Sequence, residues 1–176
     1  MKKLIVILLI ISLVIGIIIG GLVKGFLYFT QEDKPATSPG EFQLPEVSLS
    51  TLEEDTIEFN SLQQPTVLLF LIPQSQTCQL QLDILTEIHS HYNLKIITVG
   101  IGALEREKLA ALKREKGLPF PVVIDRRTEL TEKLEISTIP SLVFYQPQSE
   151  PKTIIGFQSK TDLKSEIKEY FLTKSE

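Results

Sequence analysis

One stretch of the chain, residues 66–94, limits the possible folds more than any other. Residues 66–72 form an unbroken apolar run between Pro65 and Pro73, which predicts a short strand buried on both faces of a sheet. After this run, apolar residues recur at steps of three and four, which predicts a helix with one apolar face: Leu80, Ile84, Leu85 and Ile88. A buried strand that leads directly into an amphipathic helix is typical of α/β folds.

The only cysteine of the chain lies where this strand gives way to the helix. Ser75 or Thr77 can cap the helix, and either choice places Cys78 in its first turn. The chain contains 176 residues and a single cysteine, so any thiol chemistry depends on this one side chain.

A second apolar run, residues 4–23, predicts a membrane anchor. It carries no charge, and a helix of this length spans about 30 Å, enough to cross the hydrocarbon of a bilayer. The run is too long for a cleaved signal peptide and has no small-residue cleavage site. Lys2 and Lys3 precede it and only Lys24 follows closely, which favours a cytoplasmic N-terminus. We therefore expect a single-pass protein of the cell membrane with its remaining part outside the cytoplasm.

The rest of the chain divides simply. Residues 1–29 comprise the cytoplasmic start and the anchor, and residues 30–40, rich in charge, Pro, Ser and Gly, predict a flexible tether. Residues 41–174 suffice for one compact domain. Without the three lysines around the apolar run, 15 basic residues face 22 acidic ones, a net charge of about -7. An acidic domain without a basic run is a poor candidate for binding nucleic acid.

Strand and helix patterns alternate along this domain. An irregular lead-in with a small hairpin is expected over residues 41–60. Further strands are predicted at 94–100, 120–125, 141–145 and 153–157, and helices at 103–116, 128–134 and 161–171. This order predicts an α/β sandwich with a mixed central sheet.

Three segments carry a resemblance to a known fold: FLIPQSQTC after the first buried strand, GLPFPVVID midway and STIPSLVFY before the last hairpin. They resemble the thioredoxin fold, and the chain is most similar to the membrane-anchored, extracytoplasmic TlpA-type thiol-disulfide oxidoreductases of bacteria, which are related to the peroxiredoxins and the AhpC/TSA redoxins. The resemblance covers about residues 41–171 and implies a three-layer thioredoxin-like sandwich.

The active-site motif departs from this family. The family opens its helix with Cys-x-x-Cys, whereas here Ser75 occupies the place of the first, nucleophilic cysteine and Cys78 that of the second. A dithiol attacks a substrate disulfide with one sulfur and releases the product with the other, so Ser-x-x-Cys cannot complete this cycle alone. The carboxylates that assist proton transfer in such enzymes are also missing, because their places hold Leu69 and Gln81.

The resemblance also implies a substrate groove. It implies a cis peptide bond before Pro140, with this loop facing the start of the helix and offering backbone groups to an extended peptide. The expected binding residues are Gln74, Gln76, Thr77, Ile139 and Pro140. The alternative, that Pro140 only shapes its loop, stays open.

Other candidate sites are weaker. His89 and His91 are two residues apart, unlike the i, i+4 pair of a helical metal site, so we expect both to lie on the surface and not to bind a metal. We expect no other cofactor. Arg126 and Arg127 are expected on a solvated helix face. Cys78 itself is either a reactive thiol favoured by the helix start or an inert small hydrophobe.

Three functions remain open at this stage. The first is a relative of thiol-disulfide oxidoreductases that acts, if at all, through single-thiol mixed disulfides with extracytoplasmic protein thiols or peptides. The second is a non-catalytic binding or assembly factor that uses the same groove on envelope proteins. The third is a peroxiredoxin-like peroxidase. That family keeps its reactive cysteine in a Thr-x-x-Cys motif, which Ser75-Gln-Thr-Cys78 resembles. The family also needs an arginine near the thiolate, and residues 138–140 do not supply one.

Overall fold

The computed structural model describes residues 42–89, 91–92, 94–102 and 106–172. The predicted anchor at residues 4–23 and the tether at 30–40 lie outside this part, so both stay predictions. Among the described residues, no helix combines the length and apolar character needed to cross a bilayer.

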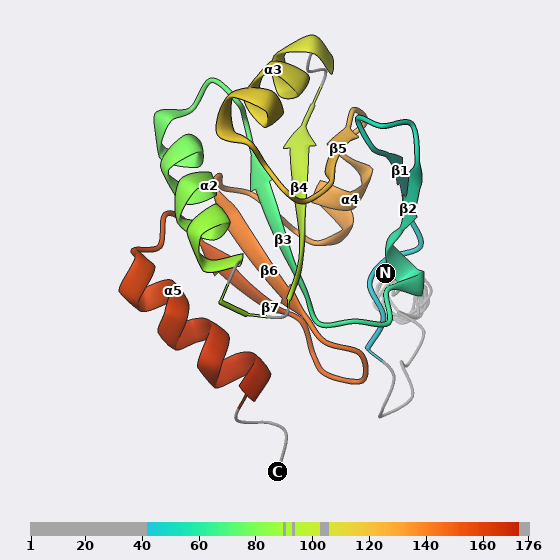
Figure 1. The fold of residues 1–176 in the computed structure, drawn as a ribbon. Helices are drawn as coiled ribbons and strands as arrows, with labels where there is room; N and C mark the ends of the chain where they lie inside the picture. The colour runs from blue at the N-terminus through green and yellow to red at the C-terminus, as the bar shows by residue number, and fades with distance from the viewer. Residues whose placement is uncertain (1–41, 90, 93, 103–105, 173–176) are drawn as a thin grey trace, which may run out of the picture. The chain divides into compact units, whose positions relative to one another are not determined.

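Five strands form one central sheet in the order β5-β4-β3-β6-β7 (Figure 1). β3 (Thr66–Leu71) pairs in parallel with β4 (Lys95–Ile101), which pairs in parallel with β5 (Val122–Asp125). β6 (Ser141–Tyr145) pairs antiparallel with β3, and β7 (Lys152–Ile155) antiparallel with β6. The predicted mixed sheet is confirmed.

The central strand, β3, is covered on both faces. All six of its residues are buried, as the unbroken apolar run predicts. Val67, Leu69 and Leu71 pack into one core cluster, and Leu68 and Phe70 into the other. Alternate side chains of one strand thus hold the two outer layers to the sheet.

One outer layer consists of three helices. α2 (Gln76–His89), α3 (Arg106–Lys116) and α5 (Lys160–Ile167), which continues into η2 (Lys168–Leu172), contribute side chains to the first cluster. Each fully buried Leu or Ile in this layer contributes about 1.5–3 kcal/mol.

The opposite layer is smaller. It contains α4 (Glu129–Lys133) and an N-terminal hairpin of β1 (Ser48–Ser50) and β2 (Thr56–Glu58), followed by η1 (Phe59–Ser61). Side chains from these elements form the second cluster, and Figure 1 shows α2 and α5 on one side of the sheet with α4 and the hairpin on the other. The expected hairpin and the three-layer arrangement are both found.

The last helix begins earlier than predicted. α5 starts at Lys160 instead of residue 161, and Ser159 is its N-cap, because the Ser159 Oγ accepts a hydrogen bond from the Asp162 backbone N–H at 3.2 Å. Asp162, three residues after this cap, places an acidic side chain in the first turn of the helix.

The apolar face of α2 is also rotated from the prediction. Leu80 is 49% exposed, whereas the residues of α2 that point inward are Cys78, Gln81, Leu82, Leu85 and Ile88. The sequence pattern predicted that Leu80 lies on the buried face because it is apolar and Gln81 is polar, but in the structure Gln81 is the buried residue. A buried polar residue is the kind of exception that an apolar pattern cannot detect.

Candidate functional site

The first turn of α2 is fixed by Ser75. The Ser75 backbone N–H donates to the Ile72 carbonyl at 3.1 Å, which turns the chain away from β3. The Ser75 Oγ accepts a hydrogen bond from the Cys78 backbone N–H at 3.3 Å. Ser75 is therefore the N-cap of α2, while Thr77 lies inside the first turn and is exposed.

Cys78 lies beneath this turn and not on its surface. Its side chain has 0% exposed area and packs in the same cluster as Leu69 and Leu82. It is a free cysteine. The environment is that of a small hydrophobe in a packed core.

The loop before β6 lies beside the start of α2. β3 and β6 are antiparallel, with Phe70 opposite Ser141, so the end of β3 and the start of β6 share one edge of the sheet. The Ile139-Pro140 bond in this loop is cis, and the Ser141 Oγ donates to the Thr138 carbonyl at 2.6 Å. The structure thus brings together the two segments that the sequence placed around a groove.

The predicted binding residues differ in accessibility. Gln74, Gln76 and Thr77 are exposed, Ile139 is half-buried, and Pro140 is buried. Pro140 contributes a backbone contact, because its carbonyl accepts a hydrogen bond from the Gly156 N–H at 2.9 Å. A role of these five residues in binding stays a prediction.

A third segment joins the site, and sequence reasoning missed it. β7 ends at Ile155, two residues earlier than predicted, because Gly156 adopts a positive φ of 85°. Beyond it, the Gln158 N–H donates to the Gln81 Oε1 at 2.6 Å, which holds this segment against α2. The side chains of Ile155 and Phe157 are 61% and 43% exposed. The sequence feature that could have revealed the early strand end is Gly156, because a glycine inside a strand-like run often marks a bend or the end of the strand.

The two positions that hold carboxylates in related enzymes are both internal. Leu69 and Gln81 have 0% exposed area. Gln81 accepts the Gln158 hydrogen bond through its carbonyl oxygen, and its Nε2 has no hydrogen-bond partner in the described part of the chain. An amide and a leucine cannot take up a proton, so neither side chain can assist proton transfer to a thiol.

The remaining candidates behave differently from one another. His91 is exposed as expected, but His89 is half-buried and its ring stands edge-on to Phe120 with the ring centres 5.7 Å apart, so the surface prediction is wrong for His89. Arg126 and Arg127 are exposed as predicted, but they lie in the turn between β5 and α4 and not on a helix face. Within the described ranges, no group of three or more His, Cys, Asp or Glu residues is placed to hold a metal ion.

The mixed sheet, the helix α2 with its Ser75 cap and the adjoining cis-proline loop together define a thioredoxin-like α/β protein. Residues 41–155 match the sequence model of the AhpC/TSA family, and the chain belongs to this family. No curated protein matches the sequence.

Solved structures agree with this fold. A secreted disulfide oxidoreductase of Mycobacterium tuberculosis, described as homologous to E. coli DsbE, superposes with a TM-score of 0.64 at 16% identity, covering 69% of this chain and 94% of that one. StoA of Bacillus subtilis gives 0.58 at 26% identity, covering 74% and 98%. A thioredoxin-like protein of Aeropyrum pernix gives 0.61 at 20% identity, covering 70% and 89%. The thioredoxin-like fold predicted from the sequence is therefore confirmed.

Proposed function

We propose that this chain is a membrane-anchored, extracytoplasmic thioredoxin-like protein of the TlpA type that binds peptide segments of envelope proteins and does not exchange disulfides. One observation carries the proposal. The only thiol, that of Cys78, has no exposed area, and the place of the attacking cysteine is taken by Ser75.

The chemistry of exchange explains why this observation matters. A thiolate must reach a substrate disulfide directly to form a mixed disulfide. Cys78 cannot do so unless the first turn of α2 opens. Ser75 is half-buried, and its hydroxyl oxygen accepts the Cys78 N–H bond. Among the described residues, no hydrogen bond joins this hydroxyl to a side chain that could remove its proton.

The groove has features that suit binding. Ile155 and Phe157 expose apolar surface next to Gly156, whose N–H is bonded to the Pro140 carbonyl. Covering such surface with a partner is worth about 25 cal/mol per Å². The exposed Gln74, Gln76 and Thr77 at the start of α2 offer hydrogen-bonding groups beside it.

The proposed location depends on residues 4–23, whose length and lack of charge suit a membrane span. One structural relative is described as secreted, which agrees with a domain outside the cytoplasm. Extracting cell membranes with carbonate, followed by protease treatment of intact spheroplasts, tests this part. Release of the chain by carbonate, or full protection of its domain from the protease, would refute it.

A second candidate is a single-thiol oxidoreductase, because Cys78 lies in the first turn of α2, at the place of the second cysteine of the dithiol motif. A peroxidase is less well supported although the chain belongs to the AhpC/TSA family. The resemblance to peroxiredoxins requires an arginine beside the thiolate. Arg106, Arg126 and Arg127 gather at the end of β5, and β4 separates β5 from β3, the strand that leads to Cys78.

The deciding experiment uses the full chain in an uncharged detergent. Insulin reduction and peroxide consumption measure the chemistry, and fluorescence anisotropy measures binding of a labelled insulin B chain with alkylated cysteines. We expect no turnover in either assay and the same affinity in Cys78→Ser. Turnover that Cys78→Ser abolishes would refute the proposal in favour of the oxidoreductase or the peroxidase.

A pair of phenylalanine variants locates the binding surface. Phe157 and Phe42 are similarly exposed, at 43% and 41%, but only Phe157 adjoins the Pro140 loop. Phe157→Ser is expected to weaken B-chain binding at least fivefold, and Phe42→Ser to leave it unchanged. Equal effects of the two substitutions, or no binding by the unchanged chain, would overturn the proposed groove.

A further inference from the structure

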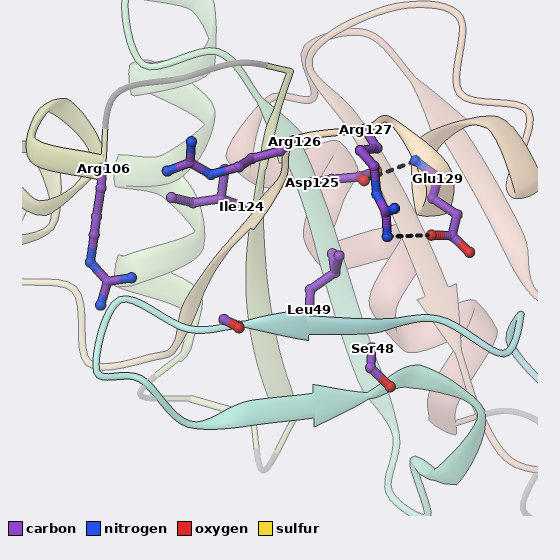
Figure 2. Close-up of a pocket in the computed structure, with 9 residues that line it drawn as sticks. Ser48, Leu49, Arg106, Ile124, Asp125, Arg126, Arg127 and Glu129 are labelled. Atoms are coloured by element: carbon purple, nitrogen blue, oxygen red, sulfur yellow. Dashed lines mark hydrogen bonds and ion pairs between the residues drawn. The ribbon is translucent and has the colours of Figure 1, made fainter.

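A cavity of about 210 Å³ lies at the carboxyl end of β5, and its lining includes none of the residues of the proposed peptide-binding surface. Three guanidinium groups line it, from Arg106 at the start of α3 and from Arg126 and Arg127 directly after β5 (Figure 2). Ser48, Leu49 and Ser50 of β1 also line the cavity. In Figure 2 the Arg126 side chain extends from the end of β5 toward the start of α3.

The buried carboxylate of this cavity is already fully used. Asp125 is 1% exposed, and its oxygens accept hydrogen bonds from the Glu129 N–H at 2.9 Å, the Thr131 N–H at 2.8 Å and the Thr131 Oγ1 at 2.7 Å. These bonds hold α4 against β5. Asp125 therefore has a structural role and does not pair with the arginines around it.

The other acidic groups near the cavity do not neutralise all three arginines. Glu129 lies 3.8 Å from Arg127 but shares its carboxylate with Lys133 at 3.3 Å. Arg106 donates to the Leu52 carbonyl and lies 3.8 Å from the exposed Glu54.

Arg126 has no such compensation, since no hydrogen bond or ion pair joins it to another described residue. The chain as a whole carries a formal charge of -4, so this pocket differs in sign from the protein around it.

We propose that this pocket binds a small ligand through an oxyanion, a phosphate or carboxylate group, held chiefly by Arg126 with Arg127 and Arg106 beside it. A guanidinium presents a planar fork of donors that matches the oxygens of either group. An anion between the arginines also offsets the repulsion among their like charges. The cavity is smaller than the about 300–1,000 Å³ typical of drug-sized ligands, which indicates a small molecule.

The site is independent of the proposed function. The sheet order places β4 between β5 and β3, and the cavity lining includes neither Cys78 nor Pro140. Cys78→Ser is therefore expected to leave ligand binding unchanged.

Calorimetric titration of the full chain in an uncharged detergent tests the proposal. Phosphate and succinate are titrated separately at constant ionic strength, with chloride as the background anion so that screening is equal in both arms. We expect saturable binding with one site per chain, and the tighter of the two ions identifies the oxyanion class. Arg126→Gln is expected to weaken it at least tenfold and Arg127→Gln less, whereas Arg114→Gln, an exposed arginine on α3 outside the pocket, should have no effect.

Two results would overturn the proposal. One is the absence of saturable binding of either ion up to millimolar concentration. The other is an equal loss of affinity in Arg114→Gln and Arg126→Gln, which would mean that general charge, and not the pocket, attracts the anion. The three substituted residues, Arg114, Arg126 and Arg127, are exposed, so unfolding of a variant is not expected, and its circular dichroism spectrum checks this.

Discussion

The burial of Cys78 makes a quantitative prediction about its reactivity. The sulfur has no exposed area and packs between α2 and β3, so a maleimide can reach it only after the structure opens. If the opening requires the core to unfold, it costs about 5 kcal/mol or more. Since about 1.4 kcal/mol corresponds to a factor of ten, native Cys78 should react at least about 10³-fold more slowly than in the urea-unfolded chain. Mass spectrometry of timed, quenched samples measures both rates.

A matched control separates burial from any general effect of the reagent. Gln76 is exposed in the same turn of α2, so a Gln76→Cys, Cys78→Ala variant should react at nearly the same rate folded and unfolded. Native Cys78 labelling within about tenfold of the unfolded rate would refute the reasoning. It would mean that the first turn of α2 opens locally at low cost, which is known for helix ends, and would restore the single-thiol hypothesis.

Three further predictions concern the site and the stability of the fold. Ser75→Cys recreates a dithiol at the start of α2, and it should raise insulin reduction at least tenfold above the protein-free background rate of the assay, an increase that a second substitution, Cys78→Ser, removes. Asp125→Ala leaves the Glu129 and Thr131 donors without their acceptor, so it should lower the free energy of unfolding by about 3 kcal/mol in urea titrations. The control, Asp55→Ala at an exposed position, should change it by less than about 0.5 kcal/mol. Burial raises the pKa of Tyr170 from 10.0 to about 12, so its contribution to stability is complete below pH 10 and is lost as the pH rises toward 12; Tyr170→Phe should therefore lose less stability than the unchanged chain across this interval. Equal losses in the two proteins would contradict this last prediction.

Elements whose whole length is buried were predictable from the sequence. The apolar run at residues 66–72 and β3 (Thr66–Leu71) agree within one residue, and the predicted strand at 141–145 coincides with β6. In both cases every residue is buried, so the apolar run and the strand are the same length. The hairpin of β1 and β2 was also expected from its short alternating pattern.

Contacts made by backbone and polar groups were not predictable in this way. The segment after β7 reaches the site through the N–H groups of Gly156 and Gln158, which any residue except proline could supply. The cavity of Arg106 and Arg126 depends on the parallel pairing of β4 with β5, which brings together two residues far apart in sequence. The local sequence pattern does not predict that two such residues line the same cavity.

Gln81 shows how a site of this fold can keep its shape without its chemistry. Its carbonyl oxygen accepts the Gln158 N–H at 2.6 Å and so fixes the segment that carries Phe157. A glutamate at this position could accept the same bond, but its charge would be costly at a site with no exposed area unless it took up a proton. The amide thus provides the structural hydrogen bond and removes the titratable group. Together with a capping Ser75 and a buried Cys78, it leaves the proposed binding surface without a carboxylate at position 81 and without an exposed thiol at position 78, as binding without exchange requires.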